Sequence, residues 1–154
     1  MGQVEKRLQD LGIELPVKNR KGSGVIGAKQ AGELLFLSAQ LPVREDGSLL
    51  YTGRVGTELT LEQGYEAARL CGLNVLAQIA DYVGDLDHVE SVVKVLGLVN
   101  SGGDFSSQPA VINGFSDLMV EVFGNRGMHA RSAMGAFNLP QNAPVTVDCI
   151  VKLR

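Results

Sequence analysis

The chain has 154 residues, of which 45% are apolar and 20% are charged, and its formal net charge is −3. This length and apolar content predict one ordered domain over residues 1–154 and disfavour a disordered chain. The acidic balance argues against nucleic acid as a partner, because phosphate binding requires a concentrated surface of lysine and arginine.

The first fifty residues predict a helix, a hairpin and a loop. Apolar residues recur at helical spacing over residues 4–11, so residues 1–20 are expected to form an N-terminal helical extension. Two short apolar runs, 24–29 and 34–38, are separated by four residues in the manner of a β-hairpin. Pro42 and the cluster Glu45-Asp46-Gly47-Ser48 then predict an exposed loop.

A long helix is predicted to follow. The sequence Thr60-Leu61-Glu62-Gln63 is a capping-box pattern, in which a hydroxyl and an amide side chain satisfy free backbone amides at a helix start. The helix is expected to run to about Val83, and its apolar surface is wider than one stripe, as in a helix that lies against a sheet. Residues 91–99, rich in valine and leucine, predict the returning strand of a βαβ unit with a right-handed crossover.

The last third of the chain predicts a second helix over 109–123, followed by strands over 130–136 and 144–153. Pro109 stands in the first turn of that helix, where its missing amide costs little. Two helices would then cover one face of a mixed sheet, which is an α+β sandwich of two layers. Because the sheet carries apolar residues in both phases, its other face needs a partner, and we expect an oligomer.

The sequence also bears on cellular location. Residues 5–10 carry charge where a secretory signal would need an apolar stretch, and no apolar run approaches the roughly 18 residues of a membrane span. Cys71 and Cys149 are far apart and belong to no metal-binding motif, which is typical of buried thiols in a reducing compartment. We expect a cytoplasmic protein without membrane association and without a metal site.

Three side chains are candidates for chemistry. His129 is a possible general base, but a histidine without an identifiable orienting partner is more often a packing residue. Asp148 lies among apolar neighbours in a predicted strand, where a charge on the solvated face is the simpler interpretation. Arg131 opens an apolar strand and requires a carboxylate, which can belong to a structural ion pair, the favoured interpretation, or to a ligand.

Two separated stretches resemble motifs of a known family. Residues 34–42 read Leu-Leu-Phe-Leu-Ser-Ala-Gln-Leu-Pro, and residues 130–136 read Ala-Arg-Ser-Ala-Met-Gly-Ala, followed by Leu139-Pro140 and an alternating strand over 145–151. Both are similar to signatures of the Rid family of reactive-intermediate (imine) deaminases, also called YjgF-like or L-PSP endoribonuclease. The resemblance runs from about residue 24 to residue 153, and the order of the helices between the motifs agrees with it.

This resemblance implies a chorismate-mutase-like fold of the bacillus type, packed as a homotrimer with sites between subunits. An arginine in the place of Arg131 would clamp the carboxylate of a 2-imino or enamine acid, which water hydrolyses to a 2-keto acid and ammonia without cofactor or metal. The family's site glutamate falls on Thr146, and the nearest carboxylate is Asp148, on the same strand face.

Matches to the family's binding residues remain at Ser38, Gln40, Asn113, Arg131 and Gly135. The chain departs from the family pattern in two further places, with Val25 at the usual tyrosine and Ala133 at the usual cysteine.

Three functions stay open. The leading one is a deaminase of imino acids, and the second is a ligand-binding or regulatory trimer without catalysis, which Thr146 and Val25 favour. The third is an RNA-cleaving translation inhibitor, which the acidic composition and the lack of paired histidines disfavour.

Overall fold

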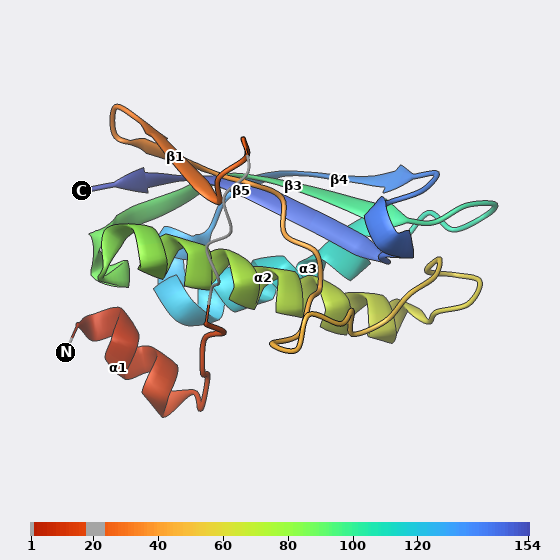
Figure 1. Cartoon of the computed structure of the whole chain (residues 1–154), viewed down its shortest axis with the longest axis horizontal. Coiled ribbons are helices and arrows are strands. Elements are labelled where there is room, and N and C mark those ends of the chain that lie inside the picture. Colours follow the sequence, from red (N-terminus) through yellow and green to blue (C-terminus); the bar gives the residue numbers. More distant parts are fainter. Residues whose placement is uncertain (1, 18–23) are drawn as a thin grey trace.

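The computed structural model describes residues 2–17 and 24–154. Over these residues the chain forms three α-helices and one sheet of five strands in the order β1-β2-β5-β3-β4 (Figure 1). In chain order the elements are α1 (Gln3–Asp10), β1 (Ala28–Ala31), β2 (Leu34–Leu37), α2 (Leu61–Val83), β3 (Val89–Asn100), α3 (Gln108–Phe123), β4 (Ala130–Ala136) and β5 (Val145–Leu153). Three short 3-10 helices, η1 (Leu86–His88), η2 (Gly124–Gly127) and η3 (Pro140–Asn142), join them.

The sheet is mixed, as the sequence predicts. β3 and β4 are parallel neighbours, whereas β5 is antiparallel to both β2 and β3. β2 and β3 are therefore parallel to each other, with α2 between them in the chain and β5 between them in the sheet. The βαβ unit expected around the long helix is thus present, and the C-terminal strand occupies its centre.

Two helices cover one face of this sheet (Figure 1). Along β5, Val145, Val147, Cys149 and Val151 are buried, and the residues between them are only partly buried. The buried faces of α2 and α3 join them in a single core, with Phe115 and Leu76 among its largest fully buried side chains. The two-layer α+β sandwich predicted from the sequence is confirmed.

The hairpin and the loop after it differ in detail from the prediction. β1 begins at Ala28, four residues later than expected, and the turn contains only Gly32 and Glu33. Gly32 has a φ of 61°, which glycine adopts without the steric cost of a side chain. Pro42, expected in an exposed loop, is buried, and Asn74 of α2 donates hydrogen bonds to the carbonyls of Leu41 and Val43 on either side of it.

The N-terminal helix packs onto the domain. Val4 and Leu8 of α1 belong to the core, and the Asp87 carboxylate accepts hydrogen bonds from the backbone amides of Gln3 and Val4 at the start of the helix. Of the extension expected over residues 1–20, residues 1 and 18–20 lie outside the described residues. Across the described part of the chain, no helix combines the length and the apolar character that crossing a membrane requires.

The long helix α2 begins with the capping box that the sequence predicts. Thr60 Oγ1 accepts from the Gln63 backbone amide at 3.1 Å, and Gln63 Oε1 accepts from the Thr60 backbone amide at 2.9 Å. Two amides at the helix start, which have no partner within the helix, are satisfied in this way.

Replacement of the cap tests its contribution. Thr60→Ala is expected to lower the free energy of unfolding by about 1 kcal/mol through the lost N-cap, without changing the affinity for a ligand. Urea unfolding measures this difference, and the exposed Thr52 supplies a control as Thr52→Ala. Equal stability of the Thr60 and Thr52 variants would show that the cap does not stabilise α2.

Candidate functional site

Arg131, the residue on which the resemblance places a carboxylate clamp, lies on edge strand β4 and contacts α3. Its Nη1 donates to Asn113 Oδ1 at 2.8 Å and to Ser116 Oγ at 3.1 Å. Asn113 and Ser116 are three residues apart and therefore share one face of the helix. Asn113, predicted from the sequence, is thus brought to Arg131, and Ser116 joins it as a residue that the sequence reasoning missed. The sequence signal for Ser116 is its position three residues after Asn113, which places both side chains on the same face of the predicted helix.

The partners of Arg131 are neutral. In the described part of the chain, the ion pairs recorded are Arg69 with Glu121 and Lys152 with Glu33 and Glu90. The structural ion pair that the sequence favoured for Arg131 is therefore not formed within the described residues. Hydrogen bonds to Asn113 and Ser116 occupy Nη1 alone, and a guanidinium has two further donor groups, Nε and Nη2, in the same plane. Such a fork matches both oxygens of a carboxylate.

His129 has the orienting partner that its sequence context did not reveal. Its Nδ1 lies 2.6 Å from the Gly127 carbonyl oxygen, and its Nε2 lies 2.9 Å from Ser116 Oγ. A carbonyl only accepts, so Nδ1 carries the proton and Nε2 is the acceptor. Arg131 only donates, so the Ser116 hydroxyl accepts from Arg131 and donates to His129.

The imidazole of His129 is held in its neutral form. Burial lowers its pKa from the ordinary value of 6.5, and the positive charge of Arg131 lowers the pKa further, against the opposing effect of the bond to Gly127. The neutral imidazole therefore predominates at neutral pH, with Nε2 able to accept a proton.

Ser38, Gln40 and Thr146 form a second group. Gln40 and Val147 exchange backbone hydrogen bonds of 2.9 and 3.2 Å, and Thr146 Oγ1 donates to the Gln40 carbonyl at 3.3 Å. The Gln40 side chain donates to the Ser38 carbonyl at 3.3 Å, and the Ser38 hydroxyl donates to the Ile26 carbonyl at 2.5 Å. Three residues singled out from the sequence are thus adjacent where the chain leaves β2.

The Arg131 group and the Thr146 group lie on opposite faces of the sheet. Leu96 of β3 stands beside Ser132 on one side and Asp148 on the other, so these three share a face. Thr146, two residues before Asp148, points to the same face, which the helices leave uncovered. Arg131 precedes Ser132 and points to the other face, toward α3. A single chain therefore does not combine the two groups in one site.

Gly135 lies on the face of β4 that carries Arg131. A Cβ at this exposed position would come within 3.0 Å of Gln108 Nε2 and 3.1 Å of Ser101 Oγ. A side chain here would therefore require the Gln108 and Ser101 side chains to shift slightly. Ala133, between Gly135 and Arg131, is partly buried.

Asp148 is half-buried on the uncovered face, and burial raises the pKa of its carboxyl above the ordinary value of 3.8. The sequence predicted that Asp148 lies on the solvent-exposed face of its strand, and in the structure its side chain is only partly exposed to solvent. A raised pKa means that folding disfavours the carboxylate, so its ionisation opposes folding as pH rises through the folded pKa.

Asp148→Asn is therefore expected to be more stable than the natural protein at pH 7, and the difference should shrink as pH falls and the carboxyl is protonated. Urea unfolding at pH 7 and at acid pH measures this change. Asp46→Asn is the matched control with the opposite sign, because hydrogen bonds from Ser48 lower the pKa of Asp46. A less stable Asp148→Asn protein at pH 7 would contradict the interpretation.

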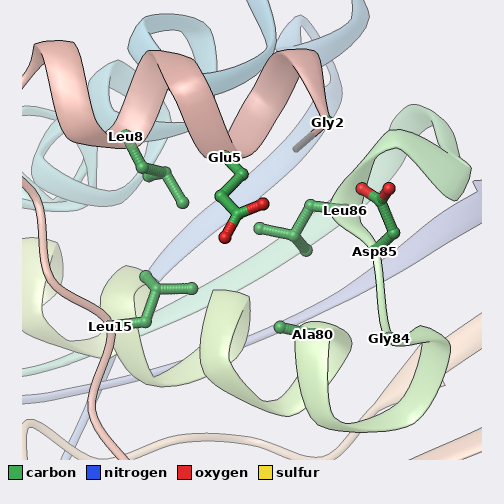
Figure 2. A pocket seen from close by; sticks show the side chains of 8 residues that line it. All are labelled: Gly2, Glu5, Leu8, Leu15, Ala80, Gly84, Asp85 and Leu86. Carbon is green, nitrogen blue, oxygen red and sulfur yellow. The ribbon is translucent and has the colours of Figure 1, made fainter.

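A cavity of about 290 Å³ lies apart from both groups, between α1, the end of α2 and η1 (Figure 2). Its lining residues are Gly2, Glu5, Leu8, Leu15, Ala80, Gly84, Asp85 and Leu86. None of the residues that the sequence predicts for a site is among them.

Comparisons with known proteins place the chain in a family. Residues 5–153 match the family model described as "YjgF/chorismate_mutase-like, putative endoribonuclease". The match begins within α1, so it extends beyond the range from residue 24 that the motifs indicated, and the N-terminal helix is not outside the family's domain.

Individual relatives are similar over nearly their whole length. Protein TCP17 of Trypanosoma cruzi is 42% identical over 99% of this chain and 95% of its own. A protein of unknown function from Agrobacterium tumefaciens is 39% identical, with a TM-score of 0.88 over 97% of this chain and 91% of its own. A Shewanella oneidensis protein with the same endoribonuclease description is 31% identical, with a TM-score of 0.92 over 99% of this chain and 100% of its own. The chain therefore belongs to the YjgF/chorismate-mutase-like family, the Rid family that its two sequence motifs resemble.

Proposed function

We propose that the protein is a homotrimer that binds small 2-keto and 2-imino acids between subunits and hydrolyses the imino or enamine acids to keto acids and ammonia. The observation that carries this proposal is the setting of Arg131. Its guanidinium is held by Asn113 and Ser116, two neutral partners that use only Nη1. Arg131 is only partly buried, so a ligand carboxylate can reach the remaining donors and would supply the counter-charge that the two neutral partners lack.

The uncovered face of the sheet supports assembly. Phe36, Leu96, Leu98, Met134 and Ile150 lie on this face by the strand register, and Phe36 and Met134 are 41% and 51% exposed. Exposed apolar side chains on a sheet face that no helix covers are typical of an interface between copies of a chain. β4 is an edge strand, so a second copy packed on this face can bring its Ser38, Gln40 and Thr146 to the rim where Arg131 lies.

The assembly is tested by light scattering, in which we expect a trimer across the micromolar range. Met134→Lys should shift the protein toward the monomer, because a lysine in an apolar interface loses its hydration. Val120→Lys is the matched control, since Val120 is 42% exposed on α3, away from the uncovered sheet face, and should leave the assembly unchanged. A natural protein that is monomeric at these concentrations would remove any site built between subunits.

The activity is tested with 2-iminopropanoate and 2-iminobutanoate, generated in the assay, by the rate of keto acid formation above the uncatalysed rate. Calorimetry with 2-oxobutanoate measures binding separately. Binding together with acceleration supports the deaminase. Binding without acceleration supports the second function, a ligand-binding or regulatory trimer, which the threonine at position 146 and Val25 favour.

Ribonuclease activity is the third function considered, because the description of the matching family model includes endoribonuclease. The net charge of −3 supplies no general attraction for RNA. The two histidines stand on different elements, His88 in η1 and His129 before β4, rather than as a pair for acid and base. An assay with a mixed RNA substrate should therefore show no cleavage.

A further inference from the structure

Ser116, which holds Arg131, is also hydrogen-bonded to His129, a residue that the carboxylate clamp does not use. Ser116 Oγ lies 2.9 Å from His129 Nε2, and the opposite ring nitrogen is fixed 2.6 Å from the Gly127 carbonyl oxygen. A hydroxyl paired with a base, which is itself oriented by a third group, is the arrangement that removes a proton during reaction. The same hydroxyl is 3.1 Å from Arg131, so the pair adjoins the proposed carboxylate site.

We propose that Ser116 and His129 act as the proton relay of this site, in place of the carboxylate that is missing at Thr146. The inference rests on the proposed function, since it assigns a step of that hydrolysis. Arg131 would hold the substrate carboxylate, whose carbon is bonded directly to C2, the carbon that water attacks. This placement fits the 2-imino acids of the proposed function, in which the imine carbon is adjacent to the carboxylate.

The step balances without any co-reactant other than water. As the water oxygen forms a bond to C2, Ser116 Oγ takes a proton from water and passes its own proton to His129 Nε2. The electrons of the C=N double bond move to nitrogen, the proton held by His129 returns through Ser116 to that nitrogen, and a neutral carbinolamine results. The relay then takes the proton of the carbinolamine hydroxyl and delivers it to the amine, so the C–N bond breaks and ammonia leaves as the C2 carbonyl forms.

The charges around His129 suit this role. Arg131, on β4, is the charged group beside it, and with burial it lowers the pKa of His129, so the base form is present at neutral pH. On α3 the neighbouring carboxylate, Asp117, accepts a hydrogen bond from Tyr65 of α2. On β3 the Lys94 ammonium is bound by a serine hydroxyl on the opposite sheet face.

The test uses the natural trimer with His129→Asn and Ser116→Ala, two variants that remove different members of the relay. Each is expected to lower kcat for 2-iminobutanoate about 100-fold, the usual contribution of a positioned base. His129→Asn, which removes no hydrogen bond to Arg131, should leave the affinity for 2-oxobutanoate unchanged. The rate of the natural protein should fall as pH decreases below 6.5, and the residual rate of His129→Asn should lose this dependence. Melting and light scattering establish that both variants fold and assemble.

His88→Asn is the matched control. His88 also has its Nδ1 paired with a backbone carbonyl, that of Val83 at 3.2 Å, but it is exposed in η1. The kcat and the pH profile of His88→Asn should equal those of the natural protein. An unchanged kcat in folded His129→Asn or Ser116→Ala would overturn the relay while the proposed function stands. A natural protein that binds keto acids but hydrolyses no imine would overturn both the hydrolysis and the relay.

Discussion

Arg131→Ala is expected to abolish measurable binding of 2-oxobutanoate while the proposed trimer and its stability are retained. A hydrogen bond between charged groups contributes about 1.5 to 3 kcal/mol, so loss of two such bonds weakens binding by more than about 100-fold. Arg131→Lys should be nearly as damaging, although it keeps the charge, because an ammonium cannot reproduce two parallel donors in one plane. Calorimetry measures the affinity, and light scattering establishes the assembly.

A second arginine serves as the control for this experiment. Arg44 is exposed and donates to the backbone carbonyls of Leu49 and Leu50, so Arg44→Ala removes a guanidinium of the same kind outside the proposed site. It should bind keto acids as the natural protein does. If Arg131→Ala instead dissociates or unfolds, and keto acids bind neither it nor the natural protein, then Arg131 has a structural role and the carboxylate site should be abandoned.

Gly114→Ala is expected to have the largest effect on stability. A Cβ at Gly114 would lie 2.0 Å from the Tyr65 carbonyl oxygen and 3.1 Å from the Arg69 backbone nitrogen, both in α2. These are backbone atoms of a packed helix, so they cannot move aside as a flexible side chain can. We expect the free energy of unfolding to fall by about 3 kcal/mol, at the upper end of the usual cost of overpacking, as α2 and α3 separate. Urea unfolding measures it.

Gly24→Ala provides the comparison, because a Cβ at that position meets nothing within 4 Å and its backbone needs no glycine conformation. This variant should unfold like the natural protein. A Gly114→Ala protein with the same stability would mean that α2 and α3 adjust freely, which would also weaken the argument that α3 holds Asn113 and Ser116 rigidly against Arg131.

Much of the fold could be predicted from local patterns. The capping box at Thr60 marked the start of α2, and Gly84 its end, because helix termini have specific chemical requirements. The alternation along 145–153 predicted β5 and its buried face, since side chains of a strand alternate between faces. The apolar residues in both phases also predicted an uncovered apolar face, and the motifs around Ser38 and Arg131 identified the family.

The sequence by itself therefore determined the elements, their order and the family, and it singled out Arg131 as a candidate, because propensity, periodicity and short motifs are properties of neighbouring residues. Only the tertiary structure decided that Ser116 and His129 join Arg131, and that Thr146 points to the opposite face. Those relations depend on the register between β3, β4 and β5 and on where α3 crosses the sheet. Register and crossing are set by packing between distant segments, and a shift of one residue would exchange the two faces.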